Sequence, residues 1–198
     1  VMKKWLTILI LILTLQTPSQ ADDIRDFQIE GMSIGDSLLD YFTEEVIKDR
    51  SYSGYKSKKF LRYVAKENKE LFKIYDTVDF HYKRSDAKYI IYSMGGTIWY
   101  ENNMKECKKK MYQIVEEMSE ILKDSVKDDQ GTEPWLEMDK TGKTKTANVY
   151  FFMKNGSYVE IACYDWSDKI TKEKNYHDHL KVALITNELG EWLRTEAH

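Results

Sequence analysis

The chain has little of several features that would point to a specialised class of protein. Its 198 residues include two prolines, and no stretch is of low complexity, which favours one compact unit. The 33 acidic residues outnumber the 30 basic ones, and the basic residues form no concentrated stripe, so we expect no nucleic acid as a partner. The two cysteines form no C-x-x-C pair, which argues against a thiol redox site.

The apolar run Trp5–Leu15 is too short to cross a bilayer as a helix, which needs about 20 residues. Two lysines precede this run, and Ser19 and Ala21 follow it as the small residues of a cleavage site. We therefore predict a signal peptide over residues 1–21 and a periplasmic or secreted protein with no stable membrane span after cleavage. A retained membrane anchor is the alternative.

Residues 22–198 have the length of a single domain. Ile34, Leu38, Phe42 and Val46 recur every fourth residue, which predicts a first helix over 34–49. Before it, Ser33 and Asp36 stand at the spacing of a capping box. A second apolar stripe predicts another helix that contains residues 60–64 and ends near residue 72.

From Ile74 the apolar period changes to two, which predicts a strand up to Tyr82. We predict a hairpin of strands 89–94 and 97–101, closed by Gly95-Gly96, because glycine tolerates the positive φ of such turns. Segment 124–146 is polar and has no period, so we expect a long connection that is either functional or mobile.

A long helix is predicted after Asn102 and Asn103, which can cap it. Its stripe has three- and four-residue spacing. The stripe consists of Met104, Cys107, Met111, Ile114, Val115, Met118, Ile121 and Leu122.

The clearest hairpin joins strands 147–153 and 157–166 through Asn155-Gly156. A two-residue turn would pair Tyr150 and Phe152 with the inward face of the second strand. A three-residue loop 154–156 would pair Val149, Phe151 and Met153 with it, and we favour this more apolar register. A last strand over 180–186 and a short helix complete the chain.

These elements predict α+β architecture, with a mostly antiparallel sheet of about six strands packed against a long central helix and two N-terminal helices. Cys107 faces inward from that helix, and Cys163 faces inward from the hairpin strand that the helix could cover. Two such thiols in an exported protein are expected to form a disulfide. The alternative is two separate buried thiols.

At the end of the hairpin away from Asn155-Gly156, the loops that end at Thr146 and begin near Asp165 emerge together. Loops held by a rigid scaffold are where binding residues concentrate, so we predict a binding site at this rim. Its candidate residues are Asp139, Lys143, Asp165, Trp166, Asp168 and His177. The histidines of His177-Asp178-His179, with Asp165 and Asp168, could alternatively hold a metal, although solvated side chains explain them as well. We predict no cofactor.

Gly35-Asp36-Ser37-Leu38 resembles the N-terminal signature of the GDSL esterases and lipases. The resemblance implies a secreted serine hydrolase with Ser37 as nucleophile. The chain departs from that family because no buried strand precedes the serine and the Gly-x-Asn-Asp block is missing. The Asp-x-x-His element is missing too, since Tyr176 stands three residues before His179. A helix cap explains the same residues.

Four segments carry a resemblance that extends over the chain after residue 21. They are Ile29–Asp40, Tyr89–Tyr92, Asp139–Thr144 and Cys163–Ser167. The chain is similar in these segments to a group of uncharacterised exported proteins of marine bacteria, a resemblance that implies export but no catalytic residues. We therefore expect a non-catalytic binding or interaction module, with a periplasmic protein or a small molecule as partner. The alternative is the esterase that uses Ser37.

Overall fold

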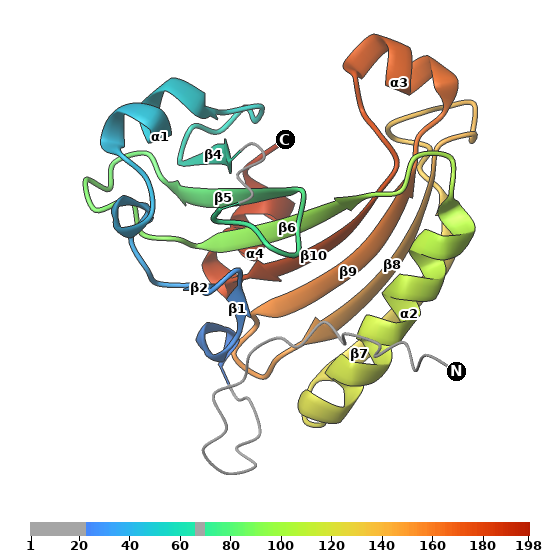
Figure 1. Cartoon of the computed structure of the whole chain (residues 1–198), viewed down its shortest axis with the longest axis horizontal. Helices are drawn as coiled ribbons and strands as arrows, with labels where there is room; N and C mark the ends of the chain where they lie inside the picture. Colours follow the sequence, from blue (N-terminus) through green and yellow to red (C-terminus); the bar gives the residue numbers. More distant parts are fainter. Residues whose placement is uncertain (1–22, 66–69) are drawn as a thin grey trace, which may run out of the picture.

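The computed structural model describes residues 23–65 and 70–198, so the predicted signal peptide lies outside the described residues. Figure 1 shows a strongly curved antiparallel sheet flanked by helices, which confirms the α+β class. The helices are α1 (Glu44–Arg50), α2 (Met104–Ile121), α3 (Asp168–Lys174) and α4 (Asn187–Thr195), with 3-10 turns η1 (Ile24–Asp26) and η2 (Leu38–Asp40). The strands are β1 (Gln28–Ile29), β2 (Met32–Ser33), β3 (Ser51–Tyr52), β4 (Phe60–Ala65), β5 (Thr77–Lys83), β6 (Ser93–Trp99), β7 (Val126–Pro134), β8 (Lys145–Phe152), β9 (Tyr158–Asp165) and β10 (His179–Ile185).

The main sheet has eight strands in the order β3-β4-β5-β6-β10-β9-β8-β7, and β1 pairs with β2 in a separate sheet. The predicted number of about six strands is therefore wrong, because β3, β4 and β7 were not expected as strands. The helix α2 packs on β9 and β10, over one half of the sheet, so the predicted central position of the long helix is wrong as well.

One face of the sheet, the core face, carries most of the apolar side chains. Val78, Phe80, Val159 and Ile161 point to it and are fully buried. The helix α2 covers one half of this face, and the N-terminal segment packs into the same hydrophobic cluster. The cap Asn103 and the buried stripe of α2 agree with the sequence prediction.

The predicted disulfide between Cys107 and Cys163 is confirmed. It joins the first turns of α2 to β9, with a Cα–Cα distance of 6.1 Å. Both cysteines are buried at the core face, as their positions in the two apolar patterns predict.

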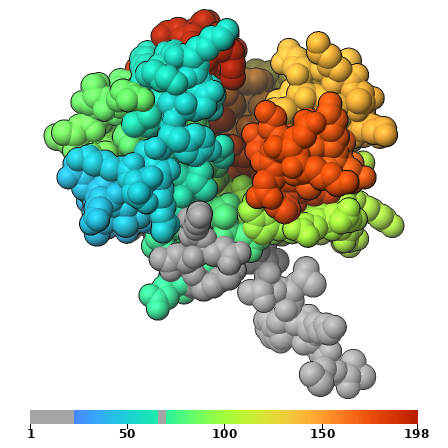
Figure 2. Space-filling view, turned by 90° about the horizontal axis from the view of Figure 1, so that it is seen from above, coloured from blue at the N-terminus to red at the C-terminus, as the bar shows by residue number. Residues whose placement is uncertain are grey.

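Among the described residues, α4 covers one end of the opposite face of the sheet, which we call the open face. There α4 packs with Phe60, Tyr158 and Ile185 in a second hydrophobic cluster around Trp192. The other end of this face lies beside α3 and the β7–β8 loop. Figure 2 shows the molecule hollowed between its cyan N-terminal half and the orange α3.

The predicted helix over 34–49 is wrong apart from the short α1 at its end. The backbone N–H groups of Gly35 and Leu38 donate to the carbonyl oxygens of Ile91 and Tyr89, at 3.0 and 3.1 Å. These bonds go to a neighbouring segment instead of along a helix, and Gly35 has a φ of +96°, outside the helical range. Ile34 and Leu38 are buried in this docked segment, whereas Leu39 is exposed.

The second predicted N-terminal helix is also wrong where the structure describes it. Residues Phe60–Ala65 form β4, which pairs with β5. Phe60 packs under α4 while Tyr63 packs in the core-face cluster, so the strand is buried on both faces. A strand covered on both faces shows no alternation, and periodicity alone does not distinguish it from a buried helix segment.

The predicted turn at Gly95-Gly96 is wrong, because both glycines lie inside β6. Neither has a positive φ, and a close approach explains them instead. A Cβ at Gly96 would lie 2.4 Å from the ring of Tyr75, and a Cβ at Gly95 would lie 2.7 Å from Cε of Lys181. The lack of a side chain at Gly95 and Gly96 therefore leaves space for the side chains of Lys181 and Tyr75.

The polar segment 124–146 contains the edge strand β7, which pairs with β8. Nearly all of β7 is exposed, so its side chains alternate between two solvated sides and leave no apolar period. The hairpin at Asn155-Gly156 has the three-residue loop that we favour. Met153 pairs with Ser157, Gly156 has a φ of +83°, and Phe151 faces Val159 on the core face.

Candidate functional site

An aromatic cluster occupies the end of the open face that α4 does not cover. We use this name for Trp99, Trp135, Tyr164, Trp166, Tyr176, His177 and His179. The ring of Tyr164 stacks on His179 at 4.6 Å and on Trp166 at 5.7 Å. None of these residues belongs to either hydrophobic cluster, and Trp99 and Tyr176 are each 39% exposed.

Strand register explains how residues far apart in sequence form this cluster. Trp99 of β6 pairs with His179 of β10, which pairs with Tyr164 of β9, so the three rings form one row across the sheet. Trp135 follows β7, and Trp166 follows β9, so their rings stand at the strand ends beside that row.

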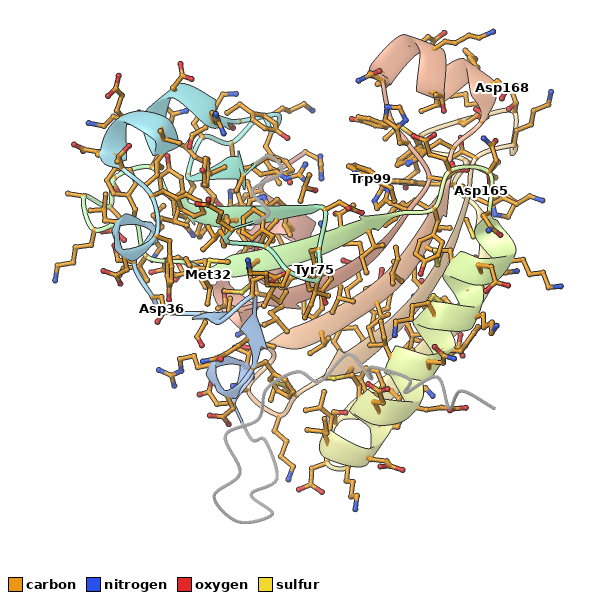
Figure 3. All side chains as sticks on the ribbon, viewed as in Figure 1. Met32, Asp36, Tyr75, Trp99, Asp165 and Asp168 are labelled. Atoms are coloured by element: carbon orange, nitrogen blue, oxygen red, sulfur yellow. A yellow bond between two sulfur atoms is a disulfide. The ribbon has the colours of Figure 1, made fainter. Side chains whose placement is uncertain are left out.

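A pocket of about 660 Å³ opens at the ends of these strands, and we call it the rim pocket. Four of the predicted site residues line it, namely Lys143, Asp165, Trp166 and Asp168. Figure 3 shows Asp165, Asp168 and Trp99 at this same end of the molecule, close to α3. The remaining lining residues are Asn102, Met104, Thr141, Ser167, Lys169 and Asp178.

Asp139, the fifth predicted residue, is 2% exposed and shapes the β7–β8 loop. Its Oδ1 accepts hydrogen bonds from the N–H and hydroxyl of Thr141, at 3.0 and 2.7 Å. Its Oδ2 accepts two more from Thr144, each at 3.2 Å. These hydrogen bonds, with that of Thr141 first, hold the pKa of Asp139 well below its usual value. Asp139 therefore positions Thr141 at the pocket.

His177, the sixth predicted residue, stands beside the rim pocket and not in its lining. Its Nδ1 lies 3.2 Å from a carboxylate oxygen of Glu101, and its ring contacts Trp99 at 6.0 Å. The structure thus gathers the predicted residues at one end of the sheet, although in three different positions relative to the pocket.

Asp178 connects three loops at this end, a role that the sequence did not indicate. Its Oδ1 accepts from the N–H of Trp166 at 2.8 Å, and its Oδ2 accepts from the N–H of Asn102 at 3.2 Å. Its carbonyl oxygen accepts from the N–H of Tyr100 at 2.9 Å. Its carboxylate is therefore engaged with backbone. The one sequence signal for Asp178 was its place between two histidines.

The geometry around His179 does not resemble a metal site. Its Nδ1 lies 2.7 Å from the carbonyl oxygen of His177, and burial lowers the pKa of its imidazole to about 4. Nδ1–H therefore donates to that carbonyl. Among residues 23–65 and 70–198, no three or more His, Cys, Asp or Glu side chains are arranged to hold a metal ion.

A second pocket, of about 360 Å³, lies on the open face between β7, β8 and β9, and we call it the face pocket. Trp135 and Tyr164 stand between it and the rim pocket, while Tyr150 and Glu160 come from its strands. The sequence did not predict it, because β7 was not expected as a strand. The signal that could have found it is the polar alternate positions of β8 and β9, which face away from the core.

A buried charge network lies on the open face beside these pockets. Asp79 accepts a hydrogen bond from Nε of Arg62 at 2.9 Å, and its other oxygen lies 3.7 Å from Nζ of Lys181. Burial would raise the pKa of Asp79, but Arg62 and Lys181 outweigh burial and hold it below its usual value. Burial lowers the pKa of the neighbouring His81 to about 3. Both cations are thus paired within the protein.

The indole of Trp166 has a buried N–H with no hydrogen-bond acceptor among the described residues. Buried donors are normally paired, so an unpaired one needs an explanation such as an ordered water or a ligand. In contrast, the indole N–H of Trp192 donates to Oγ of Ser57 at 2.9 Å.

Ser37, the candidate nucleophile of the esterase resemblance, caps the turn η2. Its hydroxyl donates to the carbonyl oxygen of Lys88 at 2.6 Å and accepts from the N–H of Leu39 at 3.1 Å. Asp36 accepts a hydrogen bond from the N–H of Ser33 at 2.8 Å, which is half of the predicted capping box.

Comparisons with known proteins leave the site to be read from its own geometry. No protein-family model matches the chain, and no similar curated protein or solved structure is found. Within the part of the chain that the structure describes, no helix combines the length and the apolar character needed to span a membrane.

Proposed function

We propose that this protein is a non-catalytic binding module that takes a small ligand at the aromatic cluster. The observation that carries the proposal is the gathering of three tryptophans, Trp99, Trp135 and Trp166, outside both hydrophobic clusters. Large aromatic side chains dominate cores and interfaces because of the area they bury, and an open cluster of them provides such area to a ligand. Ligand pockets combine aromatic walls with a few placed polar groups, as both pockets do here.

Binding without catalysis is supported by how the titratable groups of this end are engaged. Asp178 and Asp139 accept hydrogen bonds from loop backbone, and Asp79 is paired with two cations. His179 is held neutral by burial around neutral pH, with one nitrogen engaged by a carbonyl. These groups fix the shape of the site.

A thermal-shift screen against metals and small periplasmic metabolites tests the proposal, because a ligand that binds only the folded state raises apparent stability by mass action. We expect a hit to raise the Tm of the wild type and of the control Tyr112→Ala, which removes an exposed ring on α2. The same hit should lose its effect in Trp135→Ala. A shift that persists in Trp135→Ala would contradict the proposed site.

We also propose that the protein works outside the cytoplasm, as the predicted signal peptide and the resemblance to exported proteins imply. The disulfide supports this compartment, since disulfides persist in oxidising surroundings. Expression with the natural N-terminus should yield periplasmic or secreted protein that begins at Asp22. A product retained in the cytoplasm at full mass would oppose the proposal.

The esterase that uses Ser37 is the second candidate, and it rests on the GDSL resemblance alone. Short-chain ester hydrolysis by the wild type that is lost in Ser37→Ala would establish it. We expect no such hydrolysis, because the Ser37 hydroxyl caps η2 through the N–H of Leu39 and donates its own proton to the carbonyl oxygen of Lys88.

A further inference from the structure

The face pocket differs from the rim pocket in its charge. Glu133 and Glu160 line the face pocket, and no lysine or arginine of the described residues does, whereas Lys143 and Lys169 line the rim pocket beside its carboxylates. Lys181 of β10 pairs with Ala162, two residues from Glu160 on the same face, and its Nζ lies 3.7 Å from a carboxylate oxygen of Asp79. The carboxylates of the face pocket are therefore not neutralised by its own walls.

Aromatic rings form the rest of the wall. Tyr150, Tyr164 and Trp135 line the face pocket, and the rings of Trp135 and Tyr164 lie 6.1 Å apart. The hydroxyl of Tyr164 donates to Oε1 of Glu160 at 3.2 Å. Burial first, and then the field of Glu160, raise the pKa of both Tyr150 and Tyr164, so these phenols stay un-ionised and the pocket keeps only its carboxylate charge.

The edge strand is bent at this pocket. The register of β7 on β8 shifts between Asp129 and Gly131, and Gly131 has a φ of +65°. Gln130 at this bulge and Gly131 both line the pocket. Bulges of this kind re-aim side chains and are frequent beside functional sites.

From this combination we infer that the face pocket binds a small organic cation, a quaternary ammonium or a protonated amine. The ammonium group would lie against the rings of Tyr164 and Trp135, whose faces attract cations, and Glu160 would offset its charge. A volume of about 360 Å³ limits the ligand to a small molecule. The inference rests on the proposed binding function and names the ligand class for it.

Isothermal titration calorimetry with tetramethylammonium chloride tests the inference, with sodium chloride at equal ionic strength as the blank. tert-Butanol is a neutral probe of nearly the same shape, and glucose is a neutral polyol that could use the same rings. We expect tetramethylammonium to bind and both neutral probes to bind at least about tenfold more weakly, because they lack the charge that the rings and Glu160 attract.

Two variants locate the binding. Glu160→Gln should weaken the binding of tetramethylammonium at least about tenfold, since it removes the charge of the side chain and keeps its shape. Glu117→Gln, on the exposed side of α2, is the matched control and should bind as the wild type does. If Glu160→Gln fails to fold, Trp135→Leu replaces it, because Trp135 lies in a loop at the surface and its loss should weaken binding similarly.

The outcomes separate this inference from the proposed function. The inference of an organic cation is overturned if tetramethylammonium does not bind. It is also overturned if binding is unchanged in Glu160→Gln, or in Trp135→Leu where that variant replaces it. Binding of glucose or tert-butanol as tight as that of tetramethylammonium also overturns it, yet would leave the proposed binding module standing. The thermal-shift screen with Trp135→Ala decides the proposed function independently.

Discussion

The two ends of the open face use tryptophan in different ways. At one end α4 places Trp192 against Phe60 and Tyr55, and the indole is 1% exposed with its N–H paired. At the other end Trp135 and Trp166 contact each other at 5.6 Å, and the indole N–H of Trp166 has no acceptor among the described residues. A sheet face can thus be covered by a helix of its own chain, or it can stay accessible to another molecule. The end left uncovered is where we place the ligand.

Replacing a tryptophan at each end should give the largest difference in the free energy of unfolding. We expect Trp192→Ala to lower the free energy of unfolding by about 3–5 kcal/mol, because it leaves a cavity in a closed cluster. Trp135→Ala should cost less than about 1 kcal/mol, since its ring is only partly buried and lies in a loop. Urea denaturation of both variants measures the two costs. Equal losses would mean that the cluster near α3 is a structural core like the other.

Removing the disulfide should have the next largest effect. The bond spans 56 positions, and the chain-entropy model puts its contribution at about 4 kcal/mol at most. The variant Cys107→Ala/Cys163→Ala should therefore unfold at lower urea concentration than the wild type. Tyr164 follows Cys163 directly, so the variant should also weaken the binding of any ligand at the aromatic cluster. A reductant should lower the stability of the wild type and leave that of the double variant unchanged.

Acid should destabilise the protein through its buried histidines. Burial lowers the pKa of His81 from 6.5 to about 3. Between these pH values the unfolded chain therefore binds a proton at His81 that the folded protein does not bind. The stabilising contribution is complete above pH 6.5 and is lost as pH falls toward 3, at a cost of up to about 1.4 kcal/mol per pH unit. Urea midpoints at pH 7, 6 and 5 should fall less steeply in His81→Gln than in the control His198→Gln. Parallel slopes would show that His81 is not the group responsible.

The parts of the fold that the sequence predicted are those with strong local patterns. The α2 stripe and the Asn155-Gly156 loop need only neighbouring residues to define them, so their periods and turn chemistry were sufficient. The first predicted N-terminal helix was wrong because the hydrogen bonds of Gly35 and Leu38 go to residues 89–91, far along the chain. A four-residue apolar spacing does not reveal such a partner.

The candidate site was partly predictable for the same reason. Adjacent strand ends bring Lys143, Asp165 and Asp168 into one pocket, and the pairing of the two hairpin strands was enough to predict this. The face pocket depends on β7, whose exposed side chains carry no period, and on a bulge that only the pairing with β8 defines. Asp178 acts through backbone groups of distant loops, which no spacing encodes.

The smallest expected effects on stability come from replacing Trp192 and Trp166, one at each end of the open face, by phenylalanine. Trp192→Phe removes an indole N–H that donates to Oγ of Ser57, so it should cost about 1–2 kcal/mol, including lost packing. Trp166→Phe removes a buried donor that has no acceptor among the described residues, and relief of that unpaired group offsets the lost contact area. We therefore expect its stability to stay within about 0.5 kcal/mol of the wild type in urea denaturation. A cost as large as that of Trp192→Phe would mean that the Trp166 N–H is satisfied in solution by an ordered water, and the end near α3 would then be less open to a ligand than its geometry indicates.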